Sequence, residues 1–246
     1  MDISIPTPGW RAVLAVGVLA GLLAWETAQP FFARFNQPRD RLRHGARNLA
    51  FGVLNAAVVA LVFAGAWLTV TDWAAAHRFG LLNWLGLSTG PRIALAVLLL
   101  DAWTYFWHWL NHRVPFFWRF HRLHHVDRAM DVTTASRFHT VEIVFSSILR
   151  LPLLALIGCR IDELALYELL LFAVVQFHHA NIALPDRFDR VLRLLIVTPS
   201  LHKVHHSVVR AETDSNYASL FSWWDRFFGT RRISAAPHRI VFGVDE

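Results

Sequence analysis

The sequence of 246 residues contains little sulfur and little charge. Cys159 is its one cysteine, which excludes an intrachain disulfide framework, a C-x-x-C redox pair and thiolate-ligated zinc or iron–sulfur sites. Charged residues make up 17% of the chain, against about 25% in ordinary soluble domains. These shortages, together with a mean hydropathy of +0.37, exclude a disordered chain, a disulfide-rich secreted protein and a small soluble enzyme.

Apolar and aromatic residues dominate instead. Hydrophobic residues account for 55% of the chain, which has 19 phenylalanines, 11 tryptophans and 3 tyrosines. Tryptophan and tyrosine concentrate at the two interfaces of a membrane, so this composition predicts an integral membrane protein. The formal net charge is +6. Because the arginines flank apolar stretches rather than forming a basic run, we expect no nucleic-acid partner.

Several apolar stretches approach the length of about 20 residues that a membrane-spanning helix needs. We expect three N-terminal transmembrane helices over residues 12–33, 48–71 and 92–110. Two weaker stretches, 143–159 and 164–184, flank the polar turn RIDE and predict a helical hairpin. The sequence therefore predicts an all-α integral membrane protein.

Arginine counts in short loops predict how these helices are oriented. The loop between the second and third spans has few arginines, whereas the loop between the first and second contains Arg34, Arg39, Arg41, Arg43 and Arg47. We therefore expect that loop, and everything beyond residue 112, to face the cytoplasm, at what we take to be a bacterial inner membrane.

We expect a single domain over 1–246, made of membrane spans (1–90), a histidine-rich region (91–231) and a tail (232–246). Residues from Pro185 onward should fold against the membrane face.

Histidine is the unusual residue, because 11 of the 14 lie between residues 108 and 206. In HWLNH two histidines are four residues apart, which places both rings on one face of a helix. In HRLHH and HKVHH the i+3 and i+4 offsets again share a face, and we expect the last histidine of HRLHH to diverge far enough to reach a second ion. RFHTVE and FHHAN contain further histidines. The positions are His108 and His112; His121, His124 and His125; His202, His205 and His206; His139; and His178 and His179.

So many titratable rings in one region indicate a metal site, because idle buried imidazoles would be costly to desolvate. Imidazole suits zinc, copper, iron and nickel. A structural zinc takes four ligands and a catalytic zinc usually three, so about ten histidines exceed what one zinc site needs. Shared between two six-coordinate ions, they leave an open position on each. This stoichiometry favours a dinuclear redox site in a histidine-rich cap.

At these motifs the chain resembles the fatty acid hydroxylase/sterol desaturase superfamily, membrane-bound di-iron oxygenases with histidine boxes HxxxH, HxxHH and HxxHH. RFHTVE is similar to the family's RFHPLE, and FHHAN contains its recurring His-x-Asn. The segment NYASLFSWWDRFFGT (216–230) resembles the one that follows the third box in C-4 methylsterol oxidases and related bacterial proteins. The resemblance covers roughly residues 101–230.

The resemblance implies a set of metal ligands and of residues that orient them. Asp101 and Tyr105, seven and three residues before His108, are expected to orient ligand rings. Asn181 belongs to the His-x-Asn motif, and Asn216, Trp224 and Asp225 are expected to hold the cap in shape. His178 is left out of the ligand set. The implied ligands are His108, His112, His121, His124, His125, His179, His202, His205 and His206, with His139 as the tenth.

The activity that the resemblance implies is O2-dependent hydroxylation, or desaturation, of a C–H bond in a membrane lipid such as a fatty acyl chain or a sterol. Two iron ions would be the cofactor. The sequence contains no dinucleotide-binding motif. Electrons are therefore expected from a separate donor: a ferredoxin, a cytochrome b5-like protein or a flavin reductase.

Two other functions remain open from the residues alone. A zinc-dependent membrane hydrolase would keep the architecture and change the metal. A non-enzymatic divalent-metal carrier would need polar groups along its crossing helices, and the first two spans have almost none. The aromatic patches at 105–109, 116–120 and 221–228 are expected either to line a lipid pocket or to anchor the protein at the membrane interface.

Overall fold

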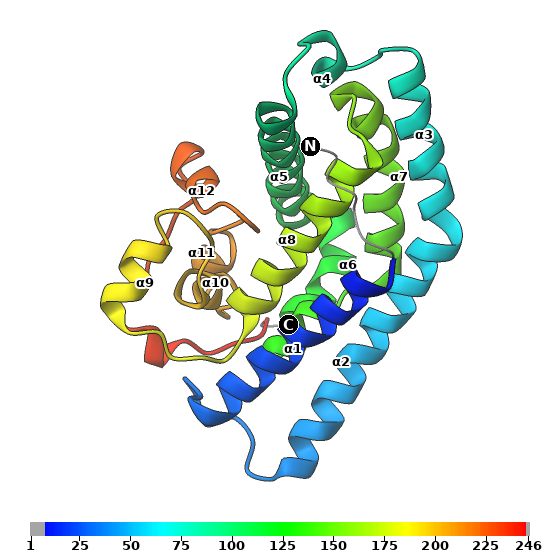
Figure 1. Ribbon diagram of the computed structural model, residues 1–246. Coiled ribbons are helices and arrows are strands. Elements are labelled where there is room, and N and C mark those ends of the chain that lie inside the picture. Colours follow the sequence, from blue (N-terminus) through cyan, green and yellow to red (C-terminus); the bar gives the residue numbers. More distant parts are fainter. Residues whose placement is uncertain (1–7, 245–246) are drawn as a thin grey trace.

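The computed structural model describes residues 8–244, and within that range the regular elements are all helices (Figure 1). Three isolated β-bridges join loops. A bundle of long helices forms one part of the molecule, and shorter helices form a cap at one end of it. In chain order the long helices are α1 (Pro8–Ala28), α2 (Pro38–Val58) with the π-helical turn Val59–Phe63, α3 (Ala64–Ala76), α5 (Thr89–Arg113), α7 (Thr140–Ile157) and α8 (Ile161–His179).

Three helical segments are long and apolar enough to cross a membrane. They are Pro38–Trp84, which includes α2, α3 and the short α4 (Leu81–Trp84), then Thr89–Arg113 and Thr140–Ile157. The expected spans 48–71 and 92–110 fall inside the first two, and α7 and α8 form the expected hairpin. The all-α membrane fold is thereby confirmed.

The first expected span is shorter than its apolar stretch suggested. The expectation of a helix through residue 33 is wrong, because α1 ends at Ala28. Pro30 follows, and a proline lacks an N–H and disfavours the helical conformation in the residue before it. Pro30 instead pairs with Ile182 in an antiparallel bridge. The apolar part of α1, Ala12–Ala28, is shorter than the helices counted as able to cross a membrane. The third of those helices is α7.

The end of the bundle near α4 is held by a close approach of two glycines. Gly80 has φ +96° and Gly158 has φ +71°, a region that L side chains rarely adopt. A Cβ on Gly80 would lie 2.3 Å from the carbonyl oxygen of Ala155. Arg92 is buried here, and its guanidinium donates to Glu163 at 2.6 Å and to the Gly158 carbonyl at 2.8 Å. This end is closed by backbone contact and one buried ion pair.

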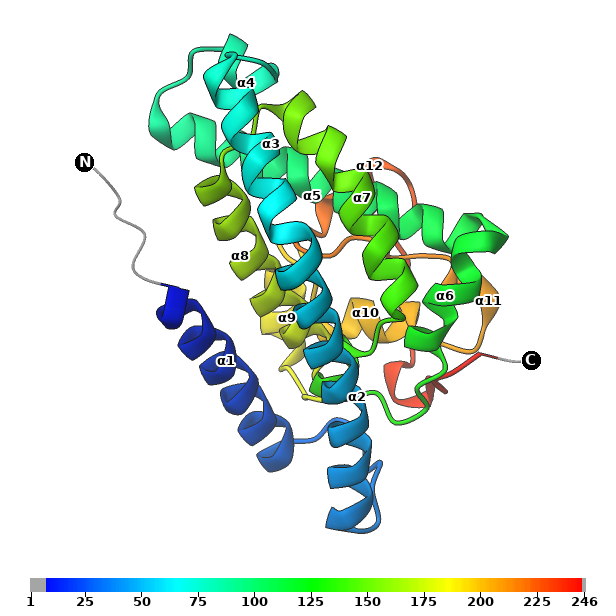
Figure 2. The same cartoon turned by 90° about the vertical axis from the view of Figure 1, so that its right-hand side faces the viewer.

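The cap consists of the segment between α5 and α7 and the segment that follows α8 (Figure 2). Its anchor on the bundle is the Asp101 carboxylate in α5, which accepts hydrogen bonds from Trp224 Nε1 at 2.8 Å and from the Phe221 amide at 3.0 Å. The apolar core of the bundle adjoins this contact, because it includes Leu100 and Tyr167, and the Tyr167 hydroxyl donates to Asp101 at 3.4 Å. The cap elements are α6 (Pro115–His125), the 3₁₀ turns Val132–Ser136 and Pro237–Arg239, α9 (Asp186–Leu192), α10 (Pro199–His205), α11 (Arg210–Thr213) and α12 (Trp223–Phe227).

Candidate metal centre

Nine histidines from four separate segments converge where the bundle meets the cap. Their ring nitrogens form two groups, and within each group the nitrogens lie within 4.8 Å of one another. The segments are the end of α5, α6, the end of α8, and α10 with the residue that follows it. One group is His108, His112, His121, His125 and His205, and the other is His124, His179, His202 and His206.

Each HxxHH motif divides its histidines between the two groups. His121 and His125 belong to the group of five, while His124 belongs to the group of four. Successive residues of an α-helix turn by about 100°, so a residue at i+4 lies about 40° from residue i and its i+3 neighbour lies about 60° away on the other side. The expectation that His125 would be the histidine to diverge is therefore wrong, because His124 diverges.

HKVHH divides in the complementary way. His202 and His206 belong to the group of four, and His205 crosses to the group of five. The ring centroids of His125 and His205 lie 4.7 Å apart, and those of His124 and His206 lie 4.6 Å apart. The two motifs thus approach each other so that each group takes two histidines from one motif and one from the other.

Hydrogen bonds at Nδ1 orient several of these rings. His108 Nδ1 donates to the Tyr217 carbonyl at 2.8 Å, His205 Nδ1 to the Ser215 carbonyl at 2.7 Å, and His179 Nδ1 to the Val175 carbonyl at 2.8 Å. A carbonyl oxygen can only accept, so Nδ1 carries the proton and Nε2 keeps its lone pair. Each of these rings therefore presents a free nitrogen lone pair to the centre of its group, as a metal-ligating histidine does.

In the group of four, hydrogen bonds between the rings cannot account for all of the short distances between Nε2 atoms. His179 Nε2 lies 3.0 Å from both His124 Nε2 and His202 Nε2. With one lone pair, it can accept from only one of them. Two nitrogens bound at right angles, each about 2.1 Å from a shared cation, would also be about 3.0 Å apart. The geometry of this group fits imidazole ligands around a cation.

In the group of five, the inward nitrogens lack any hydrogen bond within the described residues. The Nε2 atoms of His108, His112 and His121 are buried there without a partner, as are those of His125 and His205. A buried polar atom without a partner is costly, by about 1–3 kcal/mol each. A cation at the centre of the group would satisfy all five lone pairs at once.

Burial keeps the cap imidazoles neutral. It lowers the pKa of His124, His125, His202 and His206 well below the usual 6.5, and the neighbouring imidazoles lower these pKa values further. Burial also lowers the pKa of His205, to about 3, against the opposing effect of its hydrogen bond to Ser215. Neutral rings can coordinate a metal at physiological pH without first losing a proton.

Two further histidines lie outside both groups. His139, expected as a tenth ligand, sits at the N-terminus of α7, where its Nδ1 accepts from the Val141 amide at 3.1 Å and its ring packs on Phe120. His178 is buried, with its ring centroid 3.9 Å from that of His202. The structure brings together nine of the ten histidines that the sequence singled out.

Asp101 and Tyr105 bind the cap segment rather than a histidine ring. Besides Trp224 and Phe221, Asp101 accepts from the Leu220 amide at 3.3 Å. The Tyr105 hydroxyl lies 2.9 Å from Thr230 Oγ1. Both side chains thereby hold the segment whose Tyr217 carbonyl orients His108, so their effect on the histidines passes through the backbone of the cap.

The asparagine and aspartate side chains of the cap also bond to backbone. Asp225 accepts from the amides of Tyr217 at 2.8 Å and Ala218 at 3.1 Å. Asn216 has φ +52°, and its side chain donates to the Leu201 carbonyl at 3.0 Å and accepts from the Arg232 amide at 2.8 Å. These contacts hold the loop that follows α11 against α10, which bears His202 and His205 and is followed directly by His206.

Asn181 ties the start of the chain to the end of α8. Its side chain accepts from the Phe32 amide at 3.0 Å and donates to the Phe32 carbonyl at 2.9 Å. Glu26, the one acidic residue of the first apolar stretch, accepts from the Asn181 and Val132 amides, each at 3.0 Å. It also pairs with Arg41 at 2.7 Å. These bonds place α1 beside the histidine at the end of α8.

Sequence reasoning assigned no role to three carboxylates that contact histidine side chains. Glu142 accepts from His121 Nδ1 at 2.8 Å, and its place in RFHTVE was the available signal. Asp214 lies 3.5 Å from His112 Nδ1. Asp127, two residues after His125, bonds to the buried His44 at 2.8 Å. Burial alone would raise the pKa of Asp127, but the hydrogen bond and charge of His44 lower it to about 2.

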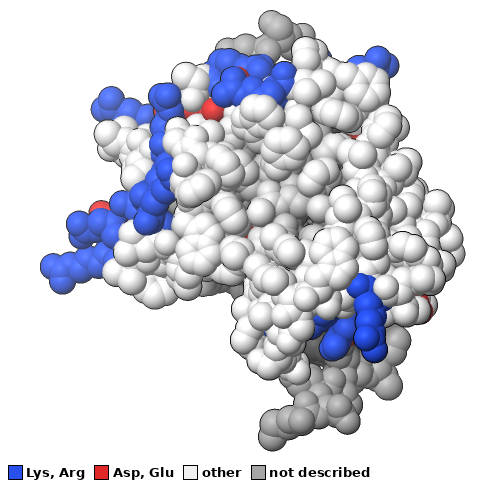
Figure 3. Space-filling model, turned by 90° about the horizontal axis from the view of Figure 1, so that it is seen from above, with Lys and Arg blue, Asp and Glu red and all other residues white. Residues whose placement is uncertain are grey.

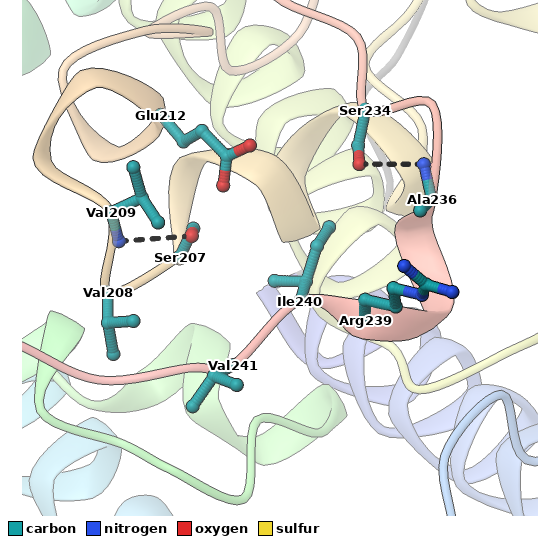
Figure 4. Close-up of a pocket in the computed structure, with 9 residues that line it drawn as sticks. All are labelled: Ser207, Val208, Val209, Glu212, Ser234, Ala236, Arg239, Ile240 and Val241. Atoms are coloured by element: carbon teal, nitrogen blue, oxygen red, sulfur yellow. Dashed lines mark hydrogen bonds between the residues drawn. The ribbon is translucent and has the colours of Figure 1, made fainter.

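A pocket of about 240 Å³ opens next to the third motif (Figure 4). It lies between the residues that follow His206 and the C-terminal segment. The Ser207 and Ser234 hydroxyls on its wall accept from the nearby Val209 and Ala236 amides, each at 3.2 Å. None of the nine clustered histidines lines it, so it is separate from the candidate metal centre.

Comparison with known proteins identifies related chains. The family model for fatty acid hydroxylase matches residues 93–230. An ornithine lipid hydroxylase from Rhizobium tropici is 29% identical over 153 residues, covering 62% of this chain and 45% of the relative. Human alkylglycerol monooxygenase is 32% identical over 149 residues, which cover 61% of this chain and 32% of the relative. Human cholesterol 25-hydroxylase is 27% identical over 151 residues, which cover 60% of this chain and 54% of the relative. The matches thus span about a third to a half of these relatives. No solved structure matches.

Proposed function

Because the chain belongs to the fatty acid hydroxylase family, we propose that it is an O2-dependent oxidoreductase that hydroxylates, or desaturates, a C–H bond of a membrane lipid. The observation that carries this proposal is the convergence of nine buried imidazoles into groups of five and four. The relatives named above are a hydroxylase of ornithine lipid, a monooxygenase of alkylglycerol and a hydroxylase of cholesterol. All three names describe oxygen insertion into a lipid, which supports the same reaction class here.

We propose two iron ions as the cofactor, one in each group of histidines. When bound, the iron pair would supply the activation of O2. His139 remains a proposed tenth ligand, which would have to move its ring away from the Val141 amide. Zinc is the alternative metal, since the group of four matches the ligand number of a structural zinc site. The Nε2 atoms of this group that lie 3.0 Å apart fit ligands at right angles better than tetrahedral ligands.

The protein's own residues would hold and shield this centre. The Tyr217 and Ser215 carbonyls and the Glu142 carboxylate keep the Nε2 lone pairs of three rings directed inward. Burial of the nine histidines excludes bulk water, which protects reactive species from side reactions. The remaining residues proposed to support the centre are Asp101, Tyr105, Asn181, Asn216 and Asp225, through the backbone contacts described above.

The position of the centre supports a lipid substrate that arrives from the bilayer. His108 and His112 lie in the last two turns of α5, a helix able to cross a membrane. A hydrocarbon chain in the adjoining leaflet therefore lies at the level of the centre. We propose that electrons come from a separate ferredoxin, cytochrome b5-like protein or flavin reductase, and that the histidine side faces the cytoplasm of a bacterial cell.

Metal analysis joined to an activity assay tests this proposal. The chain would be purified without added metal, and its metal content compared with O2-dependent changes in the lipids of cells that express it. Two irons per chain, with lipid products heavier by one oxygen or lighter by two hydrogens, are expected. One zinc per chain with hydrolysed lipids would favour the hydrolase, and ion flux in liposomes would favour the carrier. Either result would overturn the oxygenase.

A further inference from the structure

The cap exposes a ridge of large apolar side chains that the metal centre does not use. Phe227 is 78% exposed and Val191 is 68% exposed. These fractions are large for aromatic and branched side chains in a segment outside the long bundle helices. The cap ridge consists of Phe188, Val191, Leu194 and Leu195 on and after α9, and Trp223, Phe227 and Phe228 on and after α12.

The two halves of the cap ridge form one surface. Ser222 Oγ donates to the Arg193 carbonyl at 2.8 Å, and the Ser222 amide donates to the Leu195 carbonyl at 3.1 Å. Arg226 also donates to the Arg193 carbonyl, at 3.1 Å. These bonds join the end of α9 to the start of α12, so the exposed side chains of both elements are held in a fixed relation.

The cap ridge lies level with the middle of a membrane helix. The Phe228 ring stacks on Tyr105 of α5 at 4.9 Å between centroids, and Trp224 bonds to Asp101 of the same helix. Asp101 is twelve residues after the first residue of α5, a rise of about 18 Å. The hydrocarbon core of a bilayer is about 30 Å thick. A bilayer that begins at the start of α5 therefore extends beyond the level at which α12 packs.

The apolar surface continues from the cap onto α5. Phe106 is the residue after Tyr105 and is 46% exposed. Its ring stacks on that of Trp109 at 5.7 Å and approaches that of Trp103 at 6.1 Å. These aromatic rings of α5 thus extend the apolar surface that begins at Phe228 and Tyr105, and the nearest acid on this helix, Asp101, is buried.

Exposed arginines flank the cap ridge. Arg187 and Arg190 are exposed on α9, and Arg226 and Arg232 are exposed on and after α12. The acidic neighbours Asp189 and Asp225 are buried, which leaves Asp186 as the exposed acid of α9. Figure 3 shows basic side chains gathered at the edge of the molecule, on the side where Figure 1 places α9 and α12, beside a broad uncharged face. Apolar side chains bordered by arginine are typical of segments that lie in a membrane interface.

We propose that the cap ridge is inserted into the acyl-chain region of the leaflet next to the histidines, with the flanking arginines at anionic lipid phosphates. The cap is then a membrane-embedded element rather than a domain standing clear in the aqueous phase. This proposal goes beyond the proposed function and does not depend on it, because it concerns where the cap sits and not which metal or reaction the histidines support.

The test measures the depth of a spin label in the full chain. Cys159 is buried and would be replaced by alanine, after which Phe227→Cys carries the label. Leu61→Cys, at a residue 86% exposed on the π-helical turn of a membrane segment, is the lipid-facing reference. His238→Cys, at an exposed residue of the C-terminal segment, is the aqueous reference. All three variants would be placed in nanodiscs of phosphatidylcholine and phosphatidylglycerol.

The collision rates of the label with O2, which partitions into lipid, and with a water-soluble nickel chelate give the readout. We expect the O2-to-nickel accessibility ratio at Phe227 to match that at Leu61 and to exceed that at His238 severalfold. A ratio equal to that at His238 would overturn the proposal. Shielding of Phe227 from both agents would also overturn it, because it would mean that protein, such as a second copy of the chain, covers the cap ridge.

A second arm tests the arginines. In the protein labelled at Phe227, we expect the accessibility ratio to rise when phosphatidylglycerol replaces phosphatidylcholine, and this rise to shrink in the double variant Arg187→Gln, Arg190→Gln. If the accessibility ratio does not change with lipid charge, either with the arginines present or in the double variant, the assignment of the arginines to anionic phosphates is overturned.

Discussion

The main-chain carbonyl of Tyr217 accepts the Nδ1–H of His108 at 2.8 Å, across 109 positions of the sequence. The Tyr217 amide in turn donates to Asp225. The backbone of Tyr217 thus links the Asp225 carboxylate to the His108 ring. This arrangement explains why the segment after the third histidine motif matters to the candidate metal centre although it contains no clustered histidine.

Replacing His124 tests the group of four histidines. His124→Ala removes one of four converging nitrogens, and we expect loss of about one metal ion per chain and a fall in activity of at least about 100-fold. Metal content and lipid oxidation would be measured on the same preparation. His238→Ala, at an exposed histidine, is the matched control and should change neither. Full turnover by His124→Ala would refute this ligand assignment.

Glu142 should act through His121. Glu142→Ala removes the acceptor that orients the His121 ring, and an orienting partner of this kind typically contributes about 10–100-fold to metal affinity. Glu142→Gln keeps an acceptor oxygen and should retain most of the affinity. Metal dissociation constants would be compared for both variants. Equal, undiminished affinity in Glu142→Ala would show that the hydrogen bond to His121 is dispensable.

Metal binding should release few protons. The pKa values of the five cap histidines 124, 125, 202, 205 and 206 are lowered by burial, so these rings are already neutral in the metal-free protein at pH 6.5. Nine imidazoles with ordinary pKa values near 6.5 would instead release about 4.5 protons at that pH, of which the four other clustered histidines account for at most about 2. Calorimetry in buffers of different ionisation enthalpy should therefore find about two protons released or fewer. A release above about three would contradict the lowered pKa values.

Asp101 should stabilise the docking of the cap on α5. Asp101→Ala leaves the Leu220 and Phe221 amides and the Trp224 indole without their acceptor, and each buried donor so orphaned costs about 1–3 kcal/mol. We expect a clear fall in the thermal midpoint of the purified protein, followed by tryptophan fluorescence. Asp72→Asn, at an exposed acid of α3, should leave the midpoint unchanged. A midpoint for Asp101→Ala equal to that of the wild type would argue against this anchor.

The two glycines with positive φ at and near α4 should differ in their tolerance of a methyl group. Gly80→Ala would place a Cβ 2.3 Å from the Ala155 carbonyl oxygen, and overpacking of this kind costs about 1–3 kcal/mol in addition to the strained backbone. Gly86 also has positive φ, +59°, but open space surrounds it. Gly86→Ala should therefore cost only about 1 kcal/mol of backbone strain. Similar thermal midpoints for the two variants would contradict the close approach of Gly80 to Gly158.

Local sequence patterns predicted the membrane helices, the hairpin and the histidine motifs. The length of an apolar stretch and the i, i+4 spacing of HWLNH are properties of one helix, so they can be read without knowing what packs against it. Pro30 shows the limit of this reasoning, because composition alone extended the first helix five residues beyond Ala28. The proline and its pairing with Ile182 end the helix earlier.

Only the tertiary structure decided how the histidines are grouped. His205 lies with His108, and His124 lies with His202, because helices far apart in the sequence cross at that point. The same holds for Glu142 beside His121 and for His139 outside both groups. The spacing of side chains along one helix determines which rings share a face. Which rings from different helices share a cation depends on how those helices pack, and that is set by contacts between residues tens of positions apart.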